Sequence, residues 1–165
     1  MTTIFAKGLL LAGVILGQPV LSAQAEDLKS GMAQKSLEKA PLTITDHQGH
    51  KHDFMVEVAR TGKEKEAGES SRNSVPDGTG MLFLFTPPEA AAMWMHDTPV
   101  SLDIVFIGTD GHIQAIVEKA VPFSERRLTG NGDSAAVLEV AAGTMEKYGI
   151  VVGDLVSSKD LQVVR

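Results

Sequence analysis

Three short stretches of the sequence carry side chains that could do chemistry. The first, AMWMHDTPVSLDI (residues 92–104), contains the only tryptophan, Trp94. The second, VLEV (residues 137–140), places Glu139 among apolar residues, and the third is the histidine-rich stretch DHQGHKHD (residues 46–53). An aromatic platform with carboxylates suits a sugar or a peptide, whereas grouped histidines suit Zn or Cu.

The residues around the tryptophan form the first candidate ligand site: Trp94, Met95, His96, Asp97 and Thr98. In a small domain a tryptophan more often supplies packing area, but its amphipathic ring also suits the floor of a pocket. His96 and Asp97 are polar and fall where the chain turns, so we expect partial exposure. Asp97 could also simply bond backbone N–H groups within a turn.

Asp103 is an acidic residue in an otherwise apolar strand. The residues on both sides of it predict a strand buried on both faces, so its carboxylate must be paired or hydrogen-bonded. Arg72 and Arg60 are candidate partners, and Arg72 is the better one. A structural ion pair is therefore favoured, with a carboxylate that faces a ligand as the alternative.

Glu139 alternates with Leu138 and Val140, which is typical of a solvent-facing strand residue. If it instead faces Asp103 and Trp94, two carboxylates beside an aromatic ring could divide the roles of general acid and general base.

The histidine-rich stretch offers His47, His50 and His52 as weak candidates for metal ligands. His50 and His52 fall on one face of a predicted strand, but the stretch is a hairpin tip, where polar residues need no special role. No nucleotide-binding or hydrolase signature is present, and we expect no cofactor.

The pattern of apolar residues predicts the elements that position these side chains. Alternating residues on either side of turns predict two hairpins, and a capping box at Thr61 and Glu64 predicts a helix over residues 62–71. The run MLFLF (residues 81–85) predicts a doubly buried strand that ends at Pro87 and Pro88, with a helical turn over residues 89–92. Further expected elements are a surface loop (122–133), a strand (136–140), a short helix (144–148) closed by Gly149, and a last strand from Leu155.

These elements predict an α+β or mainly β domain. It has six to eight short strands and two short helices, and the pattern is compatible with a partly closed barrel.

The N-terminus has the features of a secretory signal peptide. Lys7 precedes an apolar stretch, and Ala23-Gln24-Ala25 forms a small-x-small cleavage signature. We expect cleavage after Ala25, a flexible lead-in over residues 26–40 and one domain over residues 41–165. The expected compartment is the periplasm, or the outside of the cell.

Composition narrows the classes of partner. The predicted mature chain has 140 residues, with 14 basic and 21 acidic side chains. Excess negative charge opposes binding to nucleic acid and to anionic membranes. The chain has no cysteine, which excludes disulfides and thiol chemistry. A small molecule or an envelope protein is the expected partner, and the sequence does not predict an oligomeric state.

Five sequence blocks occur in an order that resembles a known family. The blocks are GMLFLF, MWMHDT, SLDIVFIGTDGHI, VLEVAAG and GIVVGDLV, and they span residues 80–156. The chain resembles the bacterial and archaeal family called domain of unknown function 192 over about residues 42–156. The resemblance implies a compact β-rich domain, often exported, with no established reaction.

The chain departs from the family pattern at several positions. Members usually show Gly-Leu-Met-x-Arg where this chain has GESSR (residues 68–72), so Glu69 and Ser70 replace apolar anchors. Either that helix is looser here, or it docks on a more polar surface. His96 and Asp97 stand where Lys-Asn is common, and Ser101 stands where proline is common. A function that needs a fixed positive charge at position 96 is therefore in doubt.

Together these patterns favour a non-enzymatic exported binding module. Its expected site combines the candidates named above: Arg72, Trp94, Met95, His96, Asp97, Thr98, Asp103 and Glu139. The alternatives are an envelope hydrolase of glycans or peptides that uses Asp97, Asp103 or Glu139, and a metal-handling protein that uses the histidine hairpin.

Overall fold

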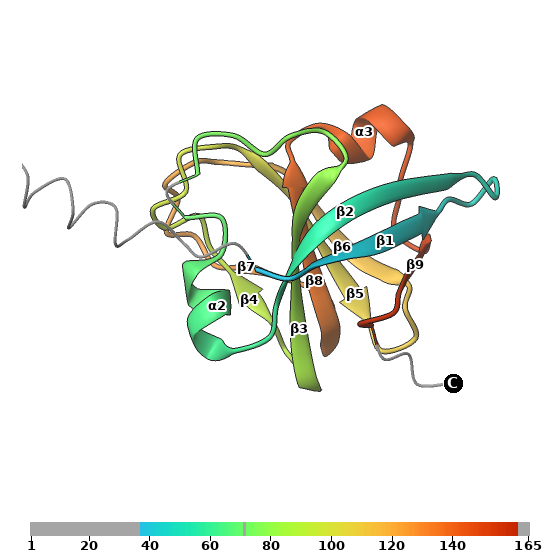
Figure 1. Cartoon of the computed structure of the whole chain (residues 1–165), viewed down its shortest axis with the longest axis horizontal. Coiled ribbons are helices and arrows are strands. Elements are labelled where there is room, and N and C mark those ends of the chain that lie inside the picture. Colours follow the sequence, from blue (N-terminus) through green and yellow to red (C-terminus); the bar gives the residue numbers. More distant parts are fainter. Residues whose placement is uncertain (1–36, 71, 162–165) are drawn as a thin grey trace, which may run out of the picture. The chain divides into compact units, whose positions relative to one another are not determined.

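The computed structural model describes residues 37–70 and 72–161. The predicted signal peptide lies outside the described residues, as does most of the predicted lead-in. Within the described part, the chain forms nine strands and two short helices (Figure 1), in the order β1 (Lys39–Thr45), β2 (Lys51–Ala59), α2 (Gly62–Ala67), β3 (Thr79–Glu89), β4 (Ala92–Met93), β5 (Leu102–Gly108), β6 (Ile113–Ala120), β7 (Leu128–Thr129), β8 (Ser134–Ala141), α3 (Thr144–Tyr148) and β9 (Leu155–Ser158). No helix among these residues is long and apolar enough to cross a membrane.

Seven strands form one curled sheet in the order β6-β5-β8-β3-β2-β1-β9. Neighbouring strands are antiparallel except β2 and β3, which are parallel and are connected through α2. β4 and β7 pair separately as a short second sheet.

The two edges of the curled sheet meet at the turn before β6. The N–H of Ile113 donates to the carbonyl of Asp154 at 2.9 Å, and the N–H of Val156 donates to the carbonyl of Gly111 at 2.9 Å. These bonds join β9 to the start of β6 and leave fewer edge groups unpaired. The predicted mainly β domain with a partly closed barrel and two short helices is confirmed.

The main sheet has an apolar core on each face. β5 contributes Val105 and Ile107 to one core and Ile104 and Phe106 to the other, as its run of buried residues predicts. The first core also contains Met145 of α3. The second core lies on the face that carries the site described below.

Two local predictions are wrong. β3 does not end at the prolines but continues through Pro87 and Pro88 to Glu89, without a helical turn after it. Its pairing with β8 shifts between Leu84 and Glu89, so the prolines occupy an irregular stretch where a missing N–H breaks no regular ladder. The predicted loop over residues 122–133 contains the two-residue strand β7.

The helix α2 begins with the predicted capping box. The Thr61 hydroxyl accepts a hydrogen bond from the N–H of Glu64, and the Glu64 carboxylate accepts one from the N–H of Thr61. The helix buries none of its own residues, yet Glu69, which follows the C-cap residue Gly68, is only 2% exposed. The sequence left open whether this helix is loosely held or docks on a polar surface. The burial of Glu69 favours docking on a polar surface.

Candidate functional site

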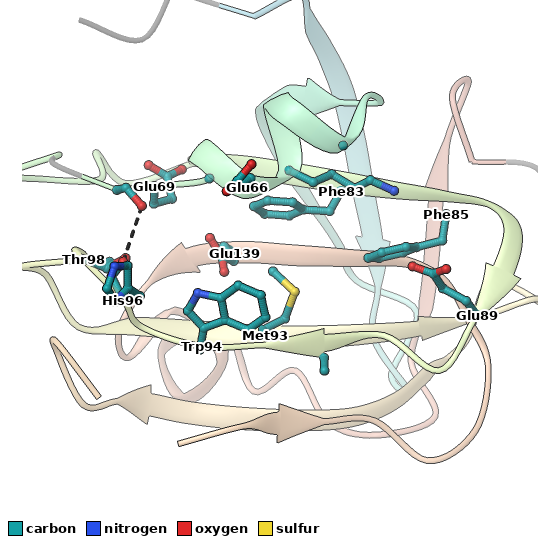
Figure 2. Close-up of a pocket in the computed structure, with 15 residues that line it drawn as sticks. Glu66, Glu69, Phe83, Phe85, Glu89, Met93, Trp94, His96, Thr98 and Glu139 are labelled. Carbon is teal, nitrogen blue, oxygen red and sulfur yellow. Dashed lines mark hydrogen bonds between the residues drawn. The ribbon is translucent and has the colours of Figure 1, made fainter. Parts of the chain in front are cut away.

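A cavity of about 380 Å³ opens on one face of the main sheet, between α2, β3, β8 and the segment that follows β4 (Figure 2). Its apolar wall includes Phe83, Phe85, Met93 and Trp94, and its acidic side chains are Glu66, Glu69, Glu89 and Glu139. The volume lies within the usual range for a small-molecule site, and so does the combination of apolar walls with a few polar groups.

The tryptophan stands at the mouth of this cavity. Met93 pairs with Leu128 of β7, and the N–H of Met95 donates to the carbonyl of Ser124 at 3.0 Å, which holds the segment on both sides of Trp94. Met95 is fully buried in the core, whereas Trp94 remains 51% exposed. The favoured expectation that Trp94 is a packing residue is therefore wrong, because the main chain there turns its neighbours inward and the indole outward.

Glu139 points into the cavity from the central strand β8. Its cross-strand neighbours on the same face are Ile104 and Met81, both fully buried. Figure 2 shows its carboxyl group between Glu69 and the indole of Trp94. The prediction of a solvent-facing strand residue is wrong, since Glu139 is only 4% exposed.

Glu69 and Arg72 form the polar surface behind the cavity. The guanidinium of Arg72 makes two hydrogen bonds to Glu57 of β2, at 2.9 and 3.2 Å, and its Nε lies 3.2 Å from a carboxylate oxygen of Glu69. The contact with Glu69 is an ion pair that lacks hydrogen-bond geometry. Among the described residues, neither Glu69 oxygen has a hydrogen-bond partner.

Burial raises the pKa of the carboxyl groups of both Glu139 and Glu69. Removal from water, together with the charge of nearby Glu69, raises the pKa of Glu139 to about 8, although Arg72 acts in the opposite direction. Burial also raises the pKa of Glu69 above its usual range, and the positive charge of Arg72 offsets this only in part. The cavity therefore holds two carboxyl groups that would gain from a new partner.

The turn that follows Trp94 forms part of the rim. His96 and Thr98 line the cavity, whereas Asp97 lies outside it with its side chain exposed. The N–H of Thr98 donates to the carbonyl of Met95 at 3.1 Å, which is the predicted turn, and Asp97 has a φ of 52°. The hydrogen bond from His96 to Glu125, with the charge of Asp97, raises the pKa of His96, so this position carries more positive charge than an isolated histidine.

Asp103 faces away from the cavity. It accepts hydrogen bonds from the N–H groups of Lys119 and Met145, both at 2.9 Å, and so fixes the start of α3 to β5. The predicted ion pair with Arg72 is therefore wrong, because backbone donors satisfy the buried carboxylate. The hypothesised pair of Asp103 and Glu139 is wrong as well. Glu139 is opposite Ile104, so the two acids point to different faces of the sheet.

The histidine hairpin is organised around one carboxylate. Nδ1 of His50 and Nε2 of His52 each lie 3.1 Å from the same oxygen of Asp46, and His47 lies 3.6 Å from Asp154. In residues 37–70 and 72–161, no group of three or more His, Asp or Glu side chains could hold a metal ion. The described contacts give these histidines a structural role at the tip of the hairpin.

The sequence profile of the DUF192 family matches residues 43–158, which is most of the chain and close to the span of 42–156 expected from the sequence. The chain belongs to the DUF192 family. The family is described as "Uncharacterized ACR". A comparison with curated proteins finds no match.

Solved structures of similar sequence share this DUF192 fold. One from Sinorhizobium meliloti 1021, described as a "putative transcription regulator", is 35% identical with a TM-score of 0.74, and the match covers 76% of this chain and 98% of that chain. Another, a protein of unknown function from Novosphingobium aromaticivorans DSM 12444, is 38% identical with a TM-score of 0.73, over 76% of this chain and 89% of that chain.

Sequence reasoning missed several residues of this DUF192 cavity. Phe83 and Phe85 were expected only as core, because a run of apolar residues does not show which of them borders a hollow. In the sequence, Glu69 stands out only as a departure from the family pattern. A charge in place of an apolar anchor was the signal that could have identified it, since a buried acid at a docking position needs a reason.

Proposed function

We propose that this protein is an exported binding module of the DUF192 family that holds a small molecule in the cavity beside Trp94. One observation carries the proposal. The carboxyl groups of Glu69 and Glu139 are almost completely buried and border a hollow with an aromatic mouth. Neither Glu69 oxygen has a hydrogen-bond partner among the described residues. An unmet buried polar group costs about 1–3 kcal/mol, and a bound ligand is a direct way to recover that free energy.

The aromatic side chains support binding of a ligand with an apolar part. Phe83 and Phe85 line the inner wall, and the exposed indole of Trp94 gives a flat surface at the entrance. A half-exposed aromatic ring beside a cavity leaves apolar surface in contact with water. A bound ligand would cover that surface and gain hydrophobic free energy.

Export is the second part of the proposal. It is supported by the charged, apolar and small-x-small segments of residues 1–25. Cell fractionation with N-terminal sequencing tests it. The expected product begins at Glu26 and is found outside the cytoplasm, whereas a cytoplasmic product that keeps Met1 would contradict export.

The similar structure from Sinorhizobium meliloti 1021 is described as a "putative transcription regulator", but the charge of this chain opposes binding to nucleic acid. A formal net charge of −6 for the whole chain opposes contact with phosphate backbones, and the cavity itself is acidic.

Binding can be tested directly because Trp94 is the only tryptophan of the chain. Indole fluorescence therefore reports on the cavity mouth alone. We expect at least one compound in a panel of amines, amino acids, sugars and carboxylic acids to change it saturably. Phe83→Ala should weaken that response, while Tyr148→Phe, which alters a ring packed against the opposite core, should leave it unchanged. A panel without any saturable response would refute the proposed function.

A further inference from the structure

The chemistry of the cavity wall restricts the kind of ligand that fits it. Four carboxyl groups line the cavity: Glu66, Glu69, Glu89 and Glu139. Glu69 and Glu139 are more than nine-tenths buried, and Glu139 is drawn pointing into the space beside Trp94 (Figure 2). Burial of these two carboxyl groups distinguishes this site from a solvated acidic surface.

The positive side chains that border the cavity already have partners. Nζ of Lys65 donates to the carbonyl of Leu84 at 3.2 Å and lies 4.4 Å from the centre of the Phe85 ring. His96 lies 2.6 Å from a carboxylate oxygen of Glu125. Among the described residues, the buried polar atoms of the cavity that lack a hydrogen-bond partner are the two carboxyl oxygens of Glu69.

A ligand must supply what the wall lacks. A sugar presents donors and acceptors in similar numbers, so its acceptors would find few donors here. A carboxylate or a phosphate would place negative charge among four acidic side chains, which would oppose their ionisation. An ammonium group carries up to three N–H donors and no acceptor, and its positive charge is also attracted to the face of an aromatic ring.

The apolar wall adds a second requirement. Phe83, Phe85 and Met93 border the same space as the carboxyl groups. A methylene chain attached to the ammonium group would cover this surface, much as the stem of a lysine side chain packs on apolar residues.

We infer that the cavity binds an alkylammonium cation, with the nitrogen held by Glu139 and Glu69 and the methylene chain packed on Phe83, Phe85 and Met93. This inference rests on the proposed function, since it names the ligand class of the same cavity. The chemistry is shared by a free polyamine and by a lysine side chain of a peptide.

Binding of a cation should release a proton. The charged or titratable groups near Glu139 come from several elements: Glu69 and Arg72 act on its pKa, and Lys65, Glu66, Glu89 and His96 line the same cavity. With a pKa of about 8, Glu139 is about nine-tenths protonated at neutral pH, and a bound ammonium group favours its ionised form. The release should approach about 0.9 proton for each ligand bound if Glu139 alone responds.

Two matched pairs of probes test the inference by Trp94 fluorescence and calorimetry. Cadaverine is compared with pentanediol, and Nα-acetyl-lysine amide with its Nε-acetylated neutral form. We expect each cation to bind at least about tenfold more tightly than its neutral match, because the neutral probe loses a charge-assisted hydrogen bond. The tighter of the two cations identifies the source as a free amine or a peptide side chain.

Variants of single carboxyl groups locate the contact. Glu139→Gln should weaken cation binding by about 10- to 100-fold and abolish proton release, measured as a loss of the dependence of binding heat on the buffer. Glu118→Gln, at an exposed position of β6, is the matched control and should change neither. Both variants can be checked for folding by thermal melting before titration.

The outcomes separate this inference from the proposed function. Equal affinity for charged and neutral probes would overturn the inference that the ligand is a cation, and so would saturable binding of sugars but not amines. Either result would leave the proposed small-molecule site in place. A complete lack of response of Trp94 to the whole panel would overturn both. Cation binding that survives Glu139→Gln with its proton release intact would refute the assignment to Glu139.

Discussion

Replacing Glu139 with glutamine should stabilise the protein by an amount that grows with pH. Glutamine keeps the size of the side chain but cannot ionise, so the variant removes the cost of placing a charge in the second core. In the folded protein the pKa of Glu139 is about 8, compared with an ordinary glutamate value of 4.5. A carboxyl group whose pKa is raised by folding contributes most stability when it is protonated. That contribution is lost as pH rises from 4.5 to 8.

The size of the effect follows from this interval. One pKa unit corresponds to about 1.4 kcal/mol, so the penalty in the wild type reaches about 3 kcal/mol at pH 7 and about 5 kcal/mol above pH 8. Near pH 4 both proteins carry a neutral group at position 139 and should have similar free energies of unfolding. The advantage of the variant should appear above that pH and level off above pH 8.

Urea unfolding at a series of pH values measures this difference. The quantity of interest is the free energy of unfolding of the variant minus that of the wild type, which cancels the titration of groups that the two proteins share. Glu118→Gln is the matched control on an exposed strand position, and its difference should stay close to zero throughout. A difference for Glu139→Gln that does not change between about pH 5 and pH 9 would refute the claim that burial holds this carboxyl group neutral.

Other positions give independent predictions. Asp103→Asn should lower the free energy of unfolding by about 2–4 kcal/mol in urea titrations, because an amide cannot accept both backbone N–H bonds that the carboxylate accepts; an unchanged midpoint would contradict this role. Gly80→Ala should cost about 3 kcal/mol or more in thermal melts, since a Cβ there would overlap the carbonyl oxygen of Glu139 and force β3 away from β8. Asp46 is buried, which opposes its ionisation, but hydrogen bonds from His52, His50 and the nearby main chain hold its pKa well below the usual value. Its contribution is therefore present above the unfolded pKa of 3.8 and lost at lower pH, so Asp46→Asn should destabilise the protein more at pH 6 than at pH 2, and an equal loss at both would contradict the linkage.

Most of the fold could be predicted because its signals are local. The alternation on either side of the turn at residues 46–49 specifies the β1–β2 hairpin, and the turn at residues 108–111 specifies the β5–β6 hairpin. The capping box at Thr61 and the αL glycine Gly149 mark helix ends through backbone geometry that needs no distant partner. Pairings between distant segments, such as the parallel pair β2–β3, have no comparable local signal.

The candidate site was predicted only in part, because a strand pattern does not identify which buried face borders a hollow. The sequence showed that Asp103 and Glu139 needed explanations. It did not show that backbone N–H groups satisfy the Asp103 carboxylate, whereas the Glu139 carboxyl group is buried at the edge of a cavity. That difference depends on what covers each face of the sheet. The start of α3 lies against Asp103 on one face, and the segment after α2, which carries Glu69, lies near Glu139 on the other.

The sequence by itself determined the family, the mainly β architecture, the acidic character and the presence of a lone tryptophan among polar neighbours. Only the tertiary structure decided that this indole remains exposed, that Glu69 lies near Glu139, and that Arg72 pairs with Glu57 instead of Asp103. The physical reason is that local patterns fix which way each side chain points along its own strand or turn. Contacts between segments dozens of residues apart depend on how the sheet curls and what covers each of its faces.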